Sequence, residues 1–277
     1  MAVLPLASLA GCLLFVSALF TMLGQGGGAF YTPLQVIFGY DFHTAASNSL
    51  FLIMVSSLAA TLVFRKAKRV DWSLAWALES AAASGAFLGG FFSYLVPAST
   101  LSWIFASVIV TAGIAMLRQA PVSAGKPMRS PRRFLWKRRC GSHRYLINML
   151  HALPLMFLAG LLSGMIGIGG GVLKVPIFVL LLGVPMGVAV GTSAFMVGLT
   201  ATSGFVGHAI TGNWDPFTSF VLAAVVFVGG RLGARVSINL DQFRLRRVCA
   251  VFLIFAAVFM ACEALIFAEA LMADPVH

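Results

Sequence analysis

The chain carries the glycine cluster Gly24-Gln25-Gly26-Gly27-Gly28 and, 143 residues further on, a second one, Gly167-Ile168-Gly169-Gly170-Gly171. Each cluster follows a long apolar segment and precedes a short one that contains a proline, Pro33 in the first case and Pro176 in the second. Consecutive glycines destabilise a helix, because glycine loses the most conformational freedom when it is ordered. Each cluster therefore predicts a break between a long helix and a short one.

Apolar segments also make up most of the remaining chain. Of its 277 residues 60% are hydrophobic and 10% charged, whereas soluble domains carry about 25% charged residues. These values, with a mean hydropathy of +0.97, exclude a water-soluble enzyme and a disordered chain. They predict an all-α polytopic membrane protein with about 8–10 membrane segments, including two short ones broken by glycine and proline. The apolar segments span approximately 4–23, 29–38, 44–64, 72–96, 101–117, 149–166, 172–182, 188–210, 216–238 and 248–268.

The two clusters belong to a longer repeat. The spacing of 143 also pairs Pro33 with Pro176, and one inserted residue changes the spacing to 144, which pairs Asp71 with Asp215. This second register aligns Gly39 with Gly183, Ala45 with Ala189, Ser49 with Ser193, Gly85 with Gly229 and Gly89 with Gly233. The sequence therefore predicts an internal duplication: a first membrane repeat at 1–118, a basic linker at 119–147 and a second membrane repeat at 148–277.

Basic residues predict the orientation of the repeats. The formal charge of +11 comes from 19 Lys and Arg against 8 Asp and Glu, and most of the basic residues lie at 65–69, 118–144 and 244–247, between apolar segments. Such loops face the cytoplasm, where anionic lipid headgroups are the expected partners and nucleic acid is not. Equivalent loops of the two halves carry opposite charge bias, which predicts inverted repeats with both termini outside.

The glycine clusters are also candidates for a transport site. A helix that begins inside the membrane directs free N–H groups and its positive dipole end at a bound anion, and broken segments at matching positions of inverted halves indicate such a site. The alternative, close helix packing, is the interpretation that we favour for Gly85, Gly89, Gly229 and Gly233. The candidate binding residues from the clusters are Gly26, Gly27, Gly28, Gly169, Gly170 and Gly171.

Polar residues follow each short segment at equivalent positions. Asn48 and Ser49 in the first half match Thr192 and Ser193 in the second. Their amide and hydroxyl groups can donate hydrogen bonds to an oxyanion without a charge that would trap it. They can equally cap a helix or bond to nearby carbonyls, but their pairing across the repeat places them among our candidates for substrate binding.

Three ionisable residues inside apolar segments complete the candidate list, because charge within a membrane is a sign of function. Lys174 directly follows the second glycine cluster, where it would either attract an anion or extend its ammonium toward water. Glu79 would pair with a base or carry a proton, and His208 would pack or relay one. Glu79 and His208 are the candidates for ion coupling.

The second glycine cluster and the residues after it resemble the signature of the TauE/SafE sulfite exporter family, and the first repeat resembles a variant in which Gln25 interrupts the cluster and Asn48 replaces a threonine. The resemblance implies a transporter of the bacterial inner membrane that moves sulfite or organosulfonates, usually outward. The residues that carry it are Gly167-Ile168-Gly169-Gly170-Gly171, Pro176, Leu182-Gly183-Val184-Pro185, Ala189-Val190-Gly191-Thr192-Ser193, Gly204, Gly207-His208, Gly212 and Asp215.

We therefore expect a secondary transporter in which the two repeats alternate in opening a site for a small anion, a sulfur oxyanion or an organosulfonate, to either side of the membrane. An anion channel that uses the same glycine-rich site is the alternative. An intramembrane enzyme is disfavoured, because the sequence lacks His-Glu-x-x-His and paired carboxylates. No cofactor and no metal ion is expected.

Overall fold

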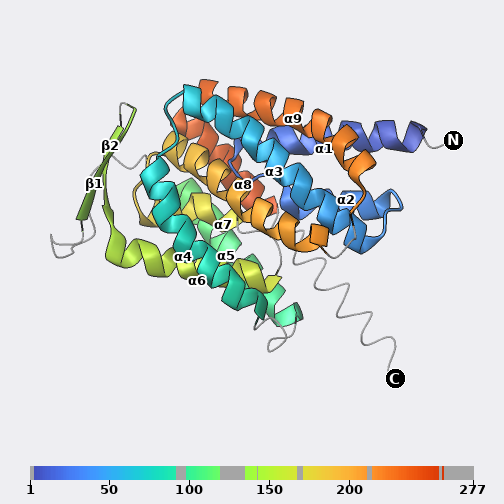
Figure 1. Ribbon diagram of the computed structural model, residues 1–277. Coiled ribbons are helices and arrows are strands. Elements are labelled where there is room, and N and C mark those ends of the chain that lie inside the picture. Colours follow the sequence, from blue (N-terminus) through green and yellow to red (C-terminus); the bar gives the residue numbers. More distant parts are fainter. Residues whose placement is uncertain are drawn as a thin grey trace.

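A computed structural model describes residues 3–91, 98–118, 135–141, 143–166, 171–210, 214–255 and 258. These residues form a bundle of helices with a two-stranded hairpin at one end (Figure 1). Residues 242–255 are helical as well. The elements are α1 (Val3–Met22), α2 (Gly28–Ile37), α3 (Phe42–Lys66), α4 (Trp72–Phe91), α5 (Ala98–Arg118), β1 (Leu135–Cys140), β2 (His143–Asn148), α6 (Met149–Ile166), α7 (Gly171–Pro176), the π-helical turn η3 (Ile177–Leu181), α8 (Met186–Ile210) and α9 (Pro216–Asn239).

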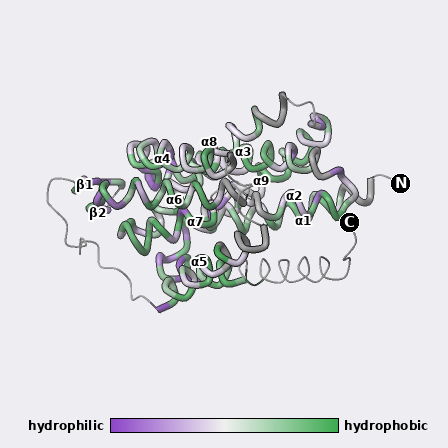
Figure 2. The backbone as a smooth tube through the Cα atoms, turned by 90° about the horizontal axis from the view of Figure 1, so that it is seen from below, coloured by the Kyte–Doolittle hydropathy of each residue, from purple (hydrophilic) through white to green (hydrophobic). Residues whose placement is uncertain are grey.

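The helices fall close to the apolar segments expected from the sequence, and the all-α membrane class is confirmed. Thr44–Lys66, Met186–Val206 and Pro216–Asn239 are each long and apolar enough to cross a membrane, judged on the described residues. Figure 2 shows apolar residues along most of the helices and hydrophilic ones around the hairpin. The predicted total of eight to ten membrane segments stays a prediction.

Glycines allow helices of the two halves to pack closely against each other. A Cβ added at Gly85 on α4 would lie 2.1 Å from the carbonyl oxygen of Phe157 on α6. A Cβ at the equivalent Gly229 on α9 would lie 2.7 Å from that of Leu14 on α1. The packing interpretation of these glycines is thus confirmed, because both backbones approach too closely for any side chain. The fourth helix of each half packs against the first helix of the other.

Two further hydrogen bonds also join the two halves, and they show the relative direction of α3 and α8. The backbone N–H of Asp71, which precedes α4, donates to Thr192 Oγ1 near the start of α8 at 3.1 Å. The backbone N–H of Asp215, which precedes α9, donates to Asn48 Oδ1 near the start of α3 at 3.4 Å. Helix α3 therefore runs antiparallel to α8, its equivalent. Inversion of the halves stays a prediction, which this antiparallel course supports.

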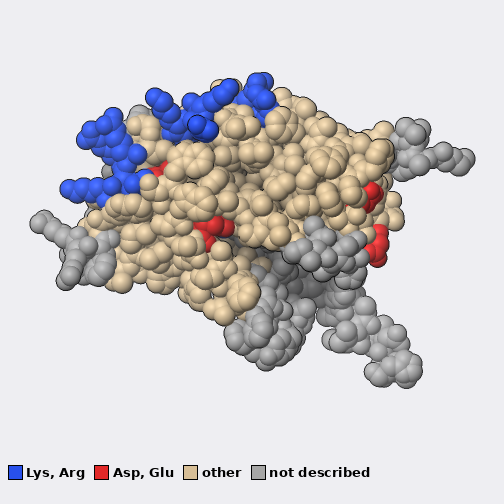
Figure 3. Space-filling model, in the orientation of Figure 1, with Lys and Arg blue, Asp and Glu red and all other residues tan. Residues whose placement is uncertain are grey.

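Basic residues gather at one end of the bundle (Figure 3). The loop after α3, the hairpin and the end of α9 meet there, and we call this the basic end. Arg69 joins two of them, because its guanidinium donates to the carbonyl oxygens of Ser237 at 3.2 Å and Ile238 at 2.9 Å. Arginine at this position satisfies carbonyls that the last turn of a helix leaves free.

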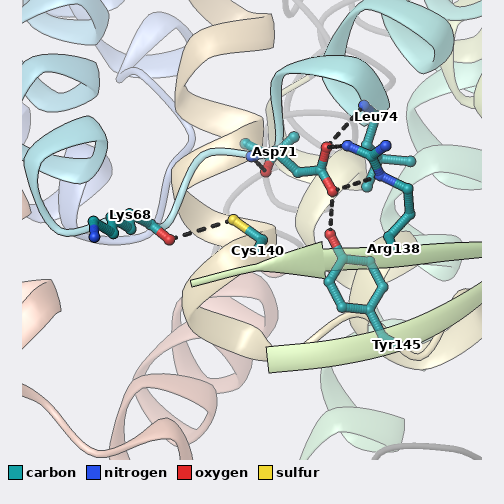
Figure 4. A network of polar contacts seen from close by, with 7 residues as sticks. Lys68, Asp71, Leu74, Arg138, Cys140 and Tyr145 are labelled. Atoms are coloured by element: carbon teal, nitrogen blue, oxygen red, sulfur yellow. Dashed lines mark hydrogen bonds and ion pairs between the residues drawn. The ribbon is translucent and has the colours of Figure 1, made fainter. Parts of the chain in front are cut away.

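The β-hairpin was not foreseen in our sequence analysis, which treated 119–147 as a linker. Strands β1 and β2 pair antiparallel, and Figure 4 shows how they attach to the bundle. The buried carboxylate of Asp71 accepts hydrogen bonds from Arg138 Nε at 3.0 Å and Tyr145 Oη at 2.6 Å. It also caps α4 by accepting from the N–H of Leu74 at 3.1 Å. Burial alone would raise the pKa of Asp71, but the hydrogen bonds from Arg138 and Tyr145 lower it below its ordinary value.

Candidate functional site

Gly171, the last residue of the second glycine cluster, lies against the first cluster between α3 and α8. A Cβ added at Gly171 would lie 2.6 Å from the carbonyl oxygen of Gln25 and 3.0 Å from Val197. A Cβ at Gly26 would lie 2.6 Å from a methyl group of the same Val197. Val197 follows the start of α8 by 11 residues, so the clusters meet about 16 Å into that helix. Gly171 and the first cluster therefore meet near the middle of α8. Substrate binding at the clusters stays a prediction.

The first cluster is built as a turn that only glycine tolerates well. Gly24, Gly26 and Gly27 have φ values of 72°, 75° and 90°, and Gly27 is the residue before α2. Positive φ of this kind disfavours residues with a side chain. Gly28 is the first residue of α2, and Gly171 is the first residue of α7. Gly169 and Gly170 lie outside the described residues.

The four polar candidates do not converge on one point. Thr192 accepts from Asp71 at the basic end, whereas Asn48 accepts from Ser219 Oγ at 2.7 Å at the other. Equivalent residues on antiparallel helices lie at opposite ends, and only the middles of the helices coincide. Asn48 and Thr192 hold the start of α9 and α4, respectively, in this conformation.

Ser49 and Ser193 contact the short segments instead. Ser193 Oγ donates to the carbonyl oxygen of Gly24 at 2.8 Å, and so directly supports the first glycine cluster. Ser49 Oγ accepts from the buried amide of Gln35 on α2 at 2.9 Å. Both serines position the broken helices rather than present a free hydroxyl.

The two ionisable candidates Lys174 and Glu79 bind each other. Lys174 Nζ on α7 lies 2.8 Å from Glu79 Oε2 on α4, and their side chains are 3% and 7% exposed. Lys174 Nζ also donates to Thr200 Oγ1 on α8 at 3.1 Å. The hydroxyl of Thr200 is bonded to the second oxygen of Glu79 and lies 3.0 Å from the carbonyl oxygen of Met196. Lys174 does not extend to water, because Glu79 neutralises it inside the bundle.

A small cavity lies beside this ion pair. Its volume is about 10 Å³, which is room for about one water molecule. Its walls are formed by α4, α6, α7 and α8, so both halves contribute. The lining residues are Ala82, Ala86, Met156, Ala159, Gly160, Ser163, Lys174 and Thr200.

Thr200 was not among the residues predicted from the sequence. A signal was available, because Thr200 follows Ser193 by seven residues and residues seven apart lie on one helix face. His208 belongs to α8, but its side chain lies outside the described part of the structure.

The equivalent position in the first half is neutral. The spacing of the repeat places Tyr31 opposite Lys174, Ser56 opposite Thr200 and Ala223 opposite Glu79. Tyr31 is fully buried in an apolar cluster that also contains Ala223, and its hydroxyl lies beside those of Ser17 and Ser56. Equivalent positions of the two halves thus hold a charged group in the second half and an uncharged, fully buried tyrosine in the first.

Broken helices that meet at mid-depth, a buried cation and small neighbouring residues suit a solute pathway rather than a catalytic centre. Comparison with known proteins supports this interpretation. The sequence profile of the family described as "Sulfite exporter TauE/SafE" matches residues 9–260. The chain belongs to the TauE/SafE family. It is therefore an integral membrane protein of a transporter family.

Relatives carry matching names. "Probable membrane transporter protein YunE" of Bacillus subtilis is 27% identical over 226 residues, which cover 78% of this chain and 83% of that protein. "Probable membrane transporter protein YdhB" of the same bacterium is 25% identical over 216 residues, 77% of this chain and 81% of that protein. "Sulfite exporter TauE/SafE family protein 5" of Arabidopsis thaliana is 39% identical over 77 residues, 28% of this chain and 17% of that protein. No solved structure gives a significant match to the chain.

Proposed function

We propose that this TauE/SafE protein is a secondary transporter that exports a small sulfur oxyanion, sulfite or an organosulfonate, by alternating access of its two repeats. The site lies where the glycine clusters meet, with Lys174 as the positive group nearby. The name of the family supports sulfite as a substrate, and the chemistry of the site supports an anion. Backbone N–H groups at the breaks and one ammonium are donors that suit an oxyanion.

The meeting of the two clusters is the observation that carries this proposal. Irregular backbone at membrane depth is tolerated where it is buried in protein or lines a cavity, and Gly171 at the start of α7 packs against the first cluster. The cavity beside Lys174, at about 10 Å³, is too small for a sulfonate group, which is larger than a water molecule. The helices around it must separate to admit a substrate, as alternating access requires.

Uptake by proteoliposomes tests the proposal. Purified protein is reconstituted, and exchange of labelled sulfite, sulfate, thiosulfate, sulfoacetate, methanesulfonate and acetate is measured. Saturable exchange of sulfite or a sulfonate, with little exchange of acetate, is the expected result. Absence of exchange for every sulfur anion would show that the proposal is wrong.

A matched pair of glycine variants locates the site. Gly171→Val places a Cβ 2.6 Å from the Gln25 carbonyl oxygen, whereas a Cβ at Gly11, an exposed position of α1, meets nothing within 4 Å. Exchange should fall at least tenfold in Gly171→Val and remain in Gly11→Val, with both proteins eluting as folded particles. Normal exchange in Gly171→Val would remove the meeting of the clusters as the site.

A channel is the alternative that the same assay can identify. A carrier exchanges labelled anion against unlabelled anion and saturates, because each cycle moves one bound substrate. A channel gives high flux that does not depend on anion at the opposite side. We expect the behaviour of a carrier.

The proposed location is the inner membrane of a bacterial cell, with the basic end in the cytoplasm and both termini outside. Anionic lipid headgroups are the proposed partners of the basic end. Reporter fusions at Pro97 and Asp215 should report the outer side. A cytoplasmic signal from either fusion would contradict the inverted orientation.

A further inference from the structure

Lys174 and Glu79 form a neutral unit in the interior of the bundle. Both side chains are more than nine-tenths buried, and each is the nearest opposite charge of the other. Glu79 follows the start of α4 by seven residues, about 10 Å along the helix. An unpaired charge at such a place is strongly unfavourable, because protein and lipid replace the water that would solvate it.

This neutrality restricts how an anion can bind. An anion that pairs with Lys174 takes over the role of Glu79 and leaves that carboxylate without a counter-charge. The site would then carry one net negative charge. Uptake of a proton by Glu79 removes the excess, so that the empty site and the loaded site are both neutral.

We propose that a monovalent oxyanion of the sulfonate class binds to Lys174 together with one proton on Glu79, so that anion and proton are transported in a one-to-one ratio. The proposal rests on the transport function proposed above. No bond other than the O–H bond of the protonated carboxyl group is formed. Charge is conserved, since the carboxylate is neutralised by the proton and the ammonium by the anion.

Thr200 provides the hydrogen bonds that both states need. Its hydroxyl group lies within bonding distance of Glu79 and of the Met196 carbonyl oxygen, which is 3.0 Å away. With Glu79 ionised, the hydroxyl can donate to the carboxylate. With Glu79 protonated, it can donate to Met196 and accept from the new carboxyl O–H. Thr200 can thus hydrogen-bond to Glu79 in either protonation state.

Lys174 also retains capacity for a ligand. An ammonium group has three N–H donors, and within the described residues Glu79 and Thr200 account for two of them. The cavity lies directly against Lys174 and Thr200, and small residues such as Ala82 and Gly160 form its other walls. An entering anion would meet the ammonium from this cavity.

Among the described residues around the cavity, no other acidic or histidine side chain is placed to take up the coupled proton. Among the residues that line the cavity, from α4, α6, α7 and α8, Lys174 is the charged one. On the surrounding helices, His151 lies near the start of α6 and is bonded to Asn148, and Arg118 ends α5. The first half supports the same conclusion, because Tyr31 and Ala223 replace the base and the acid together, as expected for two residues that act as a unit.

The pH dependence of exchange tests the proposal in the full-length protein. The probe is methanesulfonate, whose single negative charge does not change with pH. One obligatory proton weakens its apparent affinity by about tenfold for each unit by which the pH rises above the range in which Glu79 protonates. Glu79→Gln imitates the protonated acid, so its exchange should continue with an affinity that does not depend on pH. Tyr31→Phe, at the equivalent neutral position of the first half, should keep the pH dependence of the apparent affinity that the wild type shows.

A second measurement needs no variant. Wild-type proteoliposomes loaded with a pH-sensitive dye receive an inward gradient of methanesulfonate. We expect the lumen to become acidic by one proton per anion, at a rate that a potassium and valinomycin potential does not alter. This measurement decides the question even where Glu79→Gln does not fold.

The outcomes separate this inference from the proposed function. Absence of exchange for every sulfur anion, methanesulfonate and sulfite included, would overturn the transport function itself. Exchange of sulfite alone, or methanesulfonate exchange with no luminal acidification, would overturn only the coupled binding at Lys174 and Glu79. An equal pH slope in the wild type and in a folded Glu79→Gln would do the same.

Discussion

Lys174 and Tyr31 occupy equivalent positions just after the two glycine clusters, yet their surroundings differ in charge. Lys174 contacts Glu79 and Thr200 beside a cavity, whereas Tyr31 lies in an apolar cluster with Ala223, the equivalent of Glu79. The backbone architecture is shared, as the matching glycine contacts of α4 and α9 show. The difference teaches that the same backbone arrangement can hold a buried ion pair beside a cavity in one half and a packed apolar cluster in the other.

The largest expected effect is the difference in stability and anion exchange between a substitution at Lys174 and one at Tyr31. Lys174→Met leaves Glu79 buried without a partner, so the free energy of unfolding should fall by about 3–5 kcal/mol, and anion exchange should be lost. Tyr31→Phe removes a neutral hydroxyl and should cost about 1 kcal/mol or less, with exchange retained. Thermal unfolding in detergent and exchange in proteoliposomes measure both. Equal losses of stability and exchange in the two variants would contradict the proposed difference between the two positions.

A second comparison concerns the two aspartates that precede α4 and α9. Asp71 binds Arg138 and Tyr145 of the hairpin, whereas Asp215 caps α9 through the N–H of Thr218. Asp71→Asn should weaken attachment of the hairpin by about 1.5–3 kcal/mol. Asp215→Asn should have little effect, because asparagine caps a helix as well as aspartate. Hydrogen exchange of residues 135–148 measures the change, and an equal response to the two substitutions would refute the proposed anchoring.

The close contacts of α4 with α6 and of α9 with α1 predict that equivalent glycine substitutions destabilise the two halves to a similar extent. Gly89→Ala would place its Cβ 2.1 Å from the Leu161 carbonyl oxygen, and Gly233→Ala would place its own 2.0 Å from that of Ala18. Each should lower the free energy of unfolding by about 1–3 kcal/mol, because α4 or α9 must move outward. Gly11→Ala, which meets nothing within 4 Å, is the control. A large effect in one half only would disprove equivalent packing.

The smallest expected effect is a dependence of the hairpin on pH. The pKa of Asp71 lies below its ordinary value because of Arg138 and Tyr145. The ionised carboxylate therefore stabilises the attached hairpin above the ordinary pKa of aspartate, and this contribution is lost as the pH falls through the lowered value. Protection of β1 and β2 from hydrogen exchange, corrected for intrinsic rates, should decrease toward pH 3 in the wild type. The decrease should be absent in Asp71→Asn and retained in Asp215→Asn.

Much of the architecture could be predicted from the sequence, because membrane helices leave a strong local signal. Apolar runs marked the helices, and the repeat of Gly85 and Gly229 identified the sites of close packing. The β-hairpin could not be predicted in this way. Its attachment depends on Asp71, which is distant in sequence from Arg138 and Tyr145, and a basic linker has no apolar period that would indicate strands.

The candidate site was foreseen in part. Glycine clusters, Lys174 and Glu79 stood out individually because such residues are rare in apolar segments. Their pairing did not, since Lys174 and Glu79 belong to opposite halves and meet only through the exchange of helices. The same reasoning explains why Asn48 and Thr192 contact opposite ends of the bundle, because equivalence in sequence does not imply proximity when two helices run antiparallel. Their role in substrate binding stays a prediction.

Exchange by the charge-free double variant Lys174→Gln/Glu79→Gln is the most direct test of the central claim that this ion pair creates the anion site. Removal of both charges leaves no buried charge unpaired, so the variant should fold and unfold much as the wild type does. We predict that it shows no saturable sulfite or sulfonate exchange in proteoliposomes. Exchange at the rate of the wild type would contradict the account.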